Sequence, residues 1–315
     1  MESGSKKLIL EYRPWKGQRV ASWMPIFSIA REAVYQLFRR KVFWLIYALG
    51  LLVFFLYFFG QYLFFWVADQ QAEPVVRVGG FGRANPNDML QFLRGILKMD
   101  GSAETFRNFF SFQARALVIL LAFAGTTILG EDLIHGTLLF FQSKPRGLRN
   151  YLVGKFLAAS LVVHLLTTLP ALLLFFEICF LESWSRLWTQ QRVFWGILGY
   201  GVLLNAGLVP LLFASAASVR KTVPMILLWA GLFLLIPSLC MILVEGLGLS
   251  PAWRMLDVWG CLECLGERCL GAPTSIPGQR PDLQIKPILA GLSLSLLSVF
   301  CLAITRSIYL RGENE

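Results

Sequence analysis

The residues best suited to bind a metal or to act as nucleophiles are few in this chain of 315 residues, which contains two histidines and six cysteines. Three of the cysteines, Cys261, Cys264 and Cys269, lie close together in the segment CLECLGERC. Thiolates at this spacing are weak candidates for binding a soft metal such as copper, and two of them could instead form a disulfide outside the cytoplasm. A metal site needs more ligands than three loop thiols, and no histidine lies nearby. We therefore favour a disulfide that leaves one cysteine unpaired.

The sequence lacks the motifs that membrane enzymes and ATPases use. Its histidines, His135 and His164, are not spaced as in HExxH, and no G-x-S-x-G nucleophile elbow is present. Gly154-Lys155 is followed by Phe156 and lacks the glycine spacing of a phosphate-binding loop. We therefore expect no catalytic residues, metal site or cofactor in this chain, and any ATP chemistry must come from a different chain.

The composition is that of a membrane protein. Hydrophobic residues make up 56% of the chain and charged residues only 15%. Several apolar runs exceed the roughly 18 residues needed to cross a bilayer. The formal net charge is +10, but the basic residues gather beside the apolar runs, where they set orientation and contact anionic lipid head groups. We expect a polytopic protein whose partner is the lipid bilayer, and no binding of nucleic acid.

We expect an all-α fold with six transmembrane helices. Their expected ranges are 42–68, 109–130, 156–176, 193–219, 222–244 and 287–305. Arg115 interrupts the second run, and Pro170 is expected to kink the third. The other ionisable residues in the runs are His164, which we interpret as a hydrogen-bonded core residue, and Glu177. So few charges within the spans argue against an ion-coupled transporter.

The chain before the first span divides into a basic leader, residues 1–24, and an amphipathic helix, residues 25–41. The apolar face of this helix consists of Ile26, Ala30, Ala33, Val34, Leu37 and Phe38. Its basic residues include Arg31, Arg39, Arg40 and Lys41. We expect the helix to lie in the membrane interface, and the alternative is a simple extension of the first span.

Basic residues near the span ends predict the orientation. The segments expected in the cytoplasm are the leader, Arg39 to Lys41, Lys144 to Lys155, Arg220-Lys221 and the tail 306–315. Both termini would then be cytoplasmic, and the long loops 69–108 and 245–286 would lie on the opposite side. Within the second loop, Leu247 to Leu262 could form a re-entrant or interfacial helix, with an ordinary surface loop as the alternative.

The segment between the second and third spans, GEDLIHGTLLFFQSKPRGLRNYLVGK from Gly130 to Lys155, carries its acids first and its bases last. The segment contains, in this order, an acidic turn, a Gly-Thr step, a short helix, a Pro turn, a basic segment and a Gly-Lys pair. This order resembles the membrane subunit of ABC-2 type ATP-binding-cassette transporters, which have a type V exporter fold. The matching positions are Glu131, Asp132, Gly136, Thr137, Pro145, Arg149, Gly154 and Lys155. The helix at 25–41 is similar to the elbow helix of that family, whose usual count is six spans.

The resemblance implies that residues 131–155 form a cytoplasmic coupling loop that docks into a soluble ATPase. Glu131 and Asp132 would lie at the N-terminal end of its short helix, Leu138 and Phe141 would supply apolar contacts, and Pro145 would end the helix. The protein would then be a permease of the bacterial cytoplasmic (inner) membrane. It would pair with a second copy of itself and with two ATPase chains, which hold ATP and Mg, to export an unidentified substrate.

Other interpretations stay open from the sequence. The 131–155 segment could be an ordinary membrane-surface loop with a solvated charge run. The chain could also be an anchoring or assembly subunit without a transport path. A permease-like subunit that serves copper-enzyme maturation, or a membrane enzyme that uses the cysteine cluster, would give the three loop cysteines a role.

Overall fold

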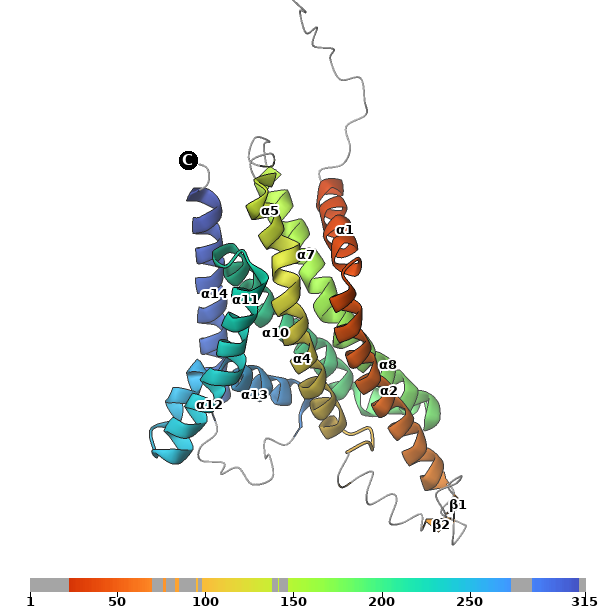
Figure 1. Ribbon diagram of the computed structural model, residues 1–315. Helices are drawn as coiled ribbons and strands as arrows, with labels where there is room; N and C mark the ends of the chain where they lie inside the picture. The colour runs from red at the N-terminus through yellow and green to blue at the C-terminus, as the bar shows by residue number, and fades with distance from the viewer. Residues whose placement is uncertain are drawn as a thin grey trace, which may run out of the picture.

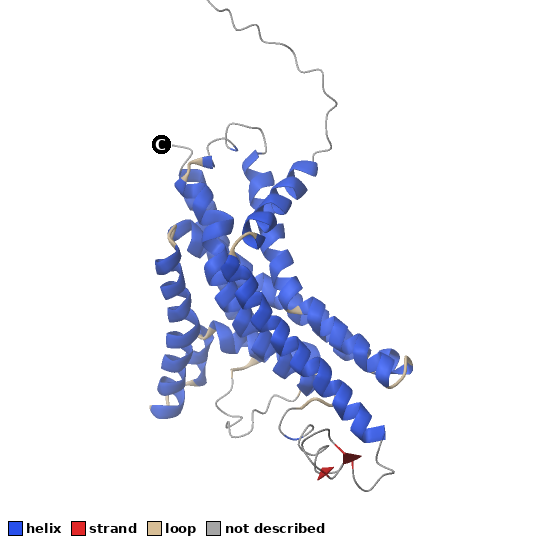
Figure 2. Cartoon of the chain, turned by 45° about the vertical axis from the view of Figure 1, so that its right-hand side comes forward, coloured by secondary structure: helices blue, strands red, loops and turns tan. Residues whose placement is uncertain are grey.

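The computed structural model describes residues 23–69, 76–77, 83–84, 95, 98–137, 141, 147–272 and 285–311, and these are almost entirely helical (Figure 1). Two short strands, β1 (Val76–Arg77) and β2 (Arg83–Ala84), pair antiparallel with Val76 opposite Ala84. Figure 2 draws them in red, near the bottom of the view. The all-α prediction is confirmed.

Among the described residues, six helical segments are long and apolar enough to cross a membrane: Lys41–Ala68, Ala103–Gly130, Gly147–Leu181, Gln191–Ser218, Thr222–Gly246 and Pro287–Tyr309. Their helices are α2 (Lys41–Asp69), α4 (Ala103–Gly125) with the π-helix η4 (Thr126–Gly130), α7 (Gly147–Leu166) with α8 (Thr168–Leu181), α10 (Gln191–Ser218), α11 (Thr222–Ala230) with η5 (Gly231–Leu235), α12 (Ile236–Met241) and η6 (Ile242–Gly246), and α14 (Pro287–Arg311). The remaining helices are α1 (Met24–Phe38), α5 (Glu131–Ile134), α9 (Ser185–Thr189), η7 (Pro251–Leu256) and α13 (Val258–Leu270). Each expected span therefore corresponds to one observed segment.

Helices α4 and α10 form the centre of the bundle. In the most apolar stretch of each span, 72% of the α4–η4 residues and 67% of the α10 residues are buried, against 11% in Thr222–Gly246. Phe110 of α4 stacks on Tyr200 of α10 with ring centroids 4.5 Å apart. The outer helices expose apolar side chains, as expected where the surrounding solvent is lipid.

The third span is interrupted where the sequence predicts a kink. Pro170 has no N–H to donate to the carbonyl of Leu166, and α7 ends at that residue. At this break the Thr167 hydroxyl donates to the Val163 carbonyl over 2.7 Å, beside the Thr167 N–H bond to the same carbonyl. His164 Nδ1 lies 2.9 Å from Thr168 Oγ1, which confirms His164 as a hydrogen-bonded residue of the bundle.

The amphipathic helix before the first span is confirmed as α1, but its apolar face packs on protein instead of facing lipid. Ala30, Ala33 and Leu37 are buried, and α1 lies along α7. Gly154 of α7 makes this approach possible, because a Cβ there would lie 2.8 Å from the Ile26 carbonyl oxygen. Small residues on both helices thus let the two backbones come close.

The exposed face of α1 carries aromatic and basic side chains, such as Phe27, Tyr35 and Arg31. This mixture is typical of a helix surface at the level of lipid head groups. In Figure 1, α1, α5 and the last turns of α14 lie at the same end of the bundle. An even number of crossings between α1 and the end of α14 accounts for that placement.

The segment from Leu247 to Leu262, expected to be a re-entrant or interfacial helix or a surface loop, contains η7 and the beginning of α13. The helix α13 begins at Val258, after the N-cap Asp257, whose carboxylate accepts from the Gly260 N–H over 2.9 Å. It ends at Gly271, which has a φ of 71° and so adopts the left-handed conformation of a helix C-terminus. The helix is buried against α4, α10 and α14 and crosses the direction of the long helices (Figure 1). A helix is thus confirmed, but it starts later than Leu247 and belongs to the core.

We expect Gly154→Ala to destabilise the protein by about 1–3 kcal/mol, because the new methyl group would force α1 away from α7. Gly231→Ala is the matched control, because a Cβ at Gly231 would meet no atom within 4 Å. The control should be neutral or stabilising by up to about 1 kcal/mol. Denaturant unfolding in detergent, followed by tryptophan fluorescence, measures both, and equal effects of the two changes would contradict the packing.

Candidate functional site

The acidic pair at the centre of the sequence motif lies at the end of a long helix. Helices α4, η4 and α5 follow one another without a break from Ala103 to Ile134. Gly130 keeps helical backbone angles, and the chain turns only at Gly136, whose φ is 67°. The prediction that Glu131 and Asp132 begin a separate short helix is therefore wrong. They lie in the last turns of the second span's helix.

This position creates an electrostatic requirement. The C-terminal end of a helix carries partial negative charge, so two acids there need basic partners from elsewhere. The structure supplies one cation to each acid, Arg40 to Glu131 and Lys155 to Asp132. We call Arg40, Glu131, Asp132, Tyr151 and Lys155 the Asp132 cluster.

Asp132 forms the more buried of the two ion pairs. The Lys155 ammonium lies 2.6 Å from Asp132 Oδ2, with only 6% of the lysine side chain exposed. The Tyr151 hydroxyl donates to the same oxygen over 2.9 Å, and Lys155 Nζ also lies 5.5 Å from the centre of the Tyr151 ring. Since Tyr151 and Lys155 are one helical turn apart on α7, both reach the same carboxylate. This arrangement fixes the end of the second span to the beginning of the third.

Glu131 connects the same helix end to the first span. Its carboxylate pairs with Arg40, which lies between α1 and α2, and both side chains are about half exposed. A cavity of about 230 Å³ adjoins this pair, with Thr126 and Thr222 among its lining residues. The hydroxyl oxygens of these two threonines lie 3.2 Å apart, so the beginning of α11 also contacts this region.

The motif residues that follow have a different environment. Gly136 and Thr137 are exposed, as is Arg149 on α7. The ring centroid of Phe141 lies 5.0 Å from that of Tyr151, so the predicted apolar residue joins the cluster. Leu138 and Pro145 lie outside the described residues.

Of the basic residues assigned to the amphipathic helix, only Arg40 joins the Asp132 cluster. Arg31, Arg39 and Lys41 are exposed, and the Arg39 guanidinium lies 5.7 Å from the centre of the Tyr35 ring. Tyr151 was missed by sequence reasoning, although its spacing of four residues from Lys155 is a usable signal. Nothing in the sequence pairs Arg40 with Glu131, because the two are far apart along the chain.

The three clustered cysteines lie on α13 and not in a loop. All six cysteines carry free thiols, so the expected disulfide is wrong. Burial raises the pKa of the Cys261 thiol to about 12, which keeps it protonated and a poor metal ligand. Within the part of the chain that the structure describes, no group of three or more His, Cys, Asp or Glu side chains could hold a metal ion.

A second polar region joins α13 to α4. The Ser111 hydroxyl donates to Glu263 Oε1 over 2.7 Å, and the Arg115 guanidinium lies 5.7 Å from the centre of the Trp259 ring. Burial raises the pKa of the Glu263 carboxyl, with Ser111 and Arg115 opposing the shift. Burial likewise raises the pKa of Glu267 to about 7.

No known protein-family model matches this chain, and no curated protein matches it. Six long helices in its described part are apolar enough to cross a bilayer. The chain is a multi-pass membrane protein. Within this membrane protein, those residues of the sequence motif that the structure describes gather at one end of the bundle, where three of the spans are joined through the Asp132 cluster.

We expect Lys155→Met to destabilise the protein by about 3–5 kcal/mol, because Asp132 would keep a buried charge without its cation. Asp132→Asn should also lower the stability. The double variant, with Lys155→Met and Asp132→Asn together, should lose less stability than the sum of the two single changes. Arg40→Gln, which breaks the more exposed pair, is the control and should cost about 0–1 kcal/mol. Unfolding in detergent measures all four proteins, and strictly additive effects would contradict the pairing.

Stability should also depend on pH through Glu267. Its carboxyl keeps its proton more strongly when folded than when unfolded, so folding is favoured at low pH. Stability should fall as the pH rises from about 4.5 through about 7, and Glu267→Gln should remove this part of the decline. Melting temperatures of the wild type and the variant at several pH values provide the measurement. Parallel curves for the two proteins would show that Glu267 does not carry the effect.

Proposed function

We propose that this chain is the permease subunit of an ABC-2 type transporter of the bacterial cytoplasmic membrane. The observation that carries the proposal is the Asp132 cluster, which ties the end of the second span to the start of the third and to the junction of α1 and α2. A junction of this kind transmits a push as rigid-body motion, since several helices are fixed to one point.

The proposed contact for the ATPase is the surface beside this junction. Ile134 is 54% exposed, which is unusual for an apolar residue at a polar helix end and suits a protein contact. His135, Gly136 and Thr137 continue the same exposed surface, and Arg149 adds a cation on α7. The Asp132 cluster would then hold the helices in place beneath the docked ATPase.

The proposed complex divides the work between two kinds of chain, as the family resemblance implies. Two ATPase chains would bind ATP and Mg, and two copies of this chain would form the membrane domain. ATP binding would draw the ATPases together and move the ends of α4 and α7, so that the substrate is exported. The end of the bundle that carries α1, α5 and the last turns of α14 would face the cytoplasm.

Capture of the tagged protein from mildly solubilised membranes of its source cells tests the proposal. An ATPase chain with Walker A and Walker B motifs should come down with the wild type. The variants to compare are Ile134→Glu and Arg149→Glu, because both residues are exposed and neither belongs to the Asp132 cluster. We expect each to reduce ATPase recovery at least severalfold. Ile134→Glu would bury an unpaired charge in the contact, and Arg149→Glu would reverse a charge there and so create a like-charge contact. Either change costs several kcal/mol.

Trp188→Glu is the control for Ile134→Glu, because Trp188 is 74% exposed and lies in α9, between the third and fourth spans. It also changes an exposed apolar residue into an acid and should leave ATPase recovery intact. If no such ATPase is recovered with the wild type in any mild detergent, the permease proposal is wrong. An ATPase that is recovered equally with all variants would place the contact elsewhere.

A further inference from the structure

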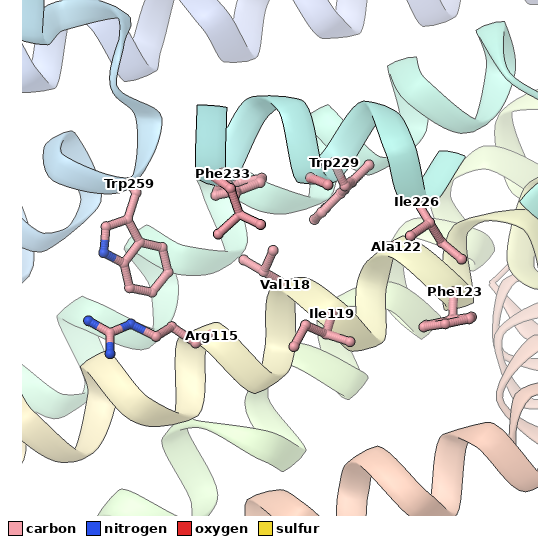
Figure 3. Close-up of a pocket in the computed structure, with 11 residues that line it drawn as sticks. Arg115, Val118, Ile119, Ala122, Phe123, Ile226, Trp229, Phe233 and Trp259 are labelled. Atoms are coloured by element: carbon pink, nitrogen blue, oxygen red, sulfur yellow. The ribbon is translucent and has the colours of Figure 1, made fainter. Parts of the chain in front are cut away.

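A cavity of about 480 Å³ opens between the second and fifth spans (Figure 3). Val118, Ile119 and Phe123 of α4 form one wall, and Ile226, Trp229 and Phe233 of α11 and η5 form the other. Trp259 of α13 lies at one end. The volume is within the range of about 300–1,000 Å³ that is typical of sites for single small ligands. Every residue of these walls is apolar, so an apolar group is the fitting occupant.

Among the described residues, Arg115 is the one with a charge that lines this cavity. Figure 3 shows its guanidinium beside the Trp259 ring, at the end of the cavity. It is also the only charged residue in the chain between Asn108 and Gly130. A cation within a membrane span is costly unless a partner meets it, so its presence marks a functional site by default.

The protein itself does not provide Arg115 with an ion pair among the described residues. The carboxylate of Glu263 interacts with it electrostatically, but that carboxylate is held by the Ser111 hydroxyl at 2.7 Å. Arg115 is exposed and contacts two aromatic faces, those of Phe112 and Trp259, each 5.7 Å from the guanidinium carbon. Its N–H groups therefore have capacity to bind an anion, which a guanidinium does through paired hydrogen bonds.

We propose that this cavity binds one single-chain anionic amphiphile, with its apolar chain between α4 and α11 and its carboxylate on Arg115. The apolar walls exclude polar solutes, and the single cation at one end requires an opposite charge at one end of the ligand. One chain is the occupant because the cavity has the size of a site for one small ligand. The proposal does not depend on an ATPase, and its test uses this chain alone.

The test is binding of dibromostearate to the purified protein in nanodiscs of zwitterionic lipid, at mildly alkaline pH. Bromine atoms quench nearby tryptophans, and Trp229 and Trp259 line the cavity. We expect saturable quenching by the wild type. Arg115→Gln should weaken this binding about ten- to a hundredfold, the loss expected for a hydrogen bond to a charged group. Arg115→Lys should retain most of the affinity, and Arg268→Gln, which removes an exposed cation elsewhere, should have no effect.

Two further measurements keep the test decisive if an arginine variant folds poorly. Ala230→Phe fills the cavity without removing the cation and should abolish saturable quenching. Dibromostearyl alcohol, which lacks the charge, should bind the wild type weakly and Arg115→Gln equally weakly. Quenching that never saturates, or that is the same in every variant, would show partition into lipid alone and overturn the proposal. Displacement of dibromostearate by phosphatidylglycerol in the nanodisc would also overturn it, because the occupant would then be a bilayer lipid.

Discussion

The ion pair between Asp132 and Lys155 is the constraint on which the end of this bundle depends. A buried ammonium and a carboxylate at the C-terminal end of a helix are each unfavourable alone, because one loses its hydration and the other meets the helix dipole. Together, and with the Tyr151 hydroxyl, they satisfy each other over 2.6 and 2.9 Å. The second and third spans are consequently fixed to one another at this end of the bundle.

The helix from Ala103 to Ile134 connects the two regions with proposed roles. Arg115 lies in its first half beside the apolar cavity, and Asp132 lies in its last turns. Phe123, between them, lines both that cavity and the smaller one beside Arg40 and Glu131. The π-helix η4 precedes the acids, and such irregular turns are frequent at functional sites. A single rigid element thus carries both the proposed ligand contact and the proposed ATPase contact.

The region around α13 shows how a polar helix is accommodated beside the spans. The Ser111 hydroxyl donates to Glu263, and the charges of Arg115 and Arg107 act on Glu263 and Glu267. Of the three cysteines on α13, Cys261 is buried, whereas Cys264 and Cys269 are half-buried. The helix packs between α4, α10 and α14, where burial raises the pKa of the Cys261 thiol. Trp259 of the same helix closes the end of the apolar cavity.

The sequence alone determined the class of the protein and the positions of its six spans. A helix that crosses a bilayer needs about 20 consecutive apolar residues, and such runs are visible in the sequence itself. It also determined the amphipathic character of α1 and the kink near Pro170. Only the tertiary structure decided what those elements contact. The partner of α1 is α7 because Gly154 leaves room, and the partner of Glu131 is Arg40, which is distant in the chain. The helix continues through Gly130 because packing within the bundle overrides the weak preference of one glycine. Local patterns specify elements, whereas long-range packing and the need to pair buried charges decide which side chains meet.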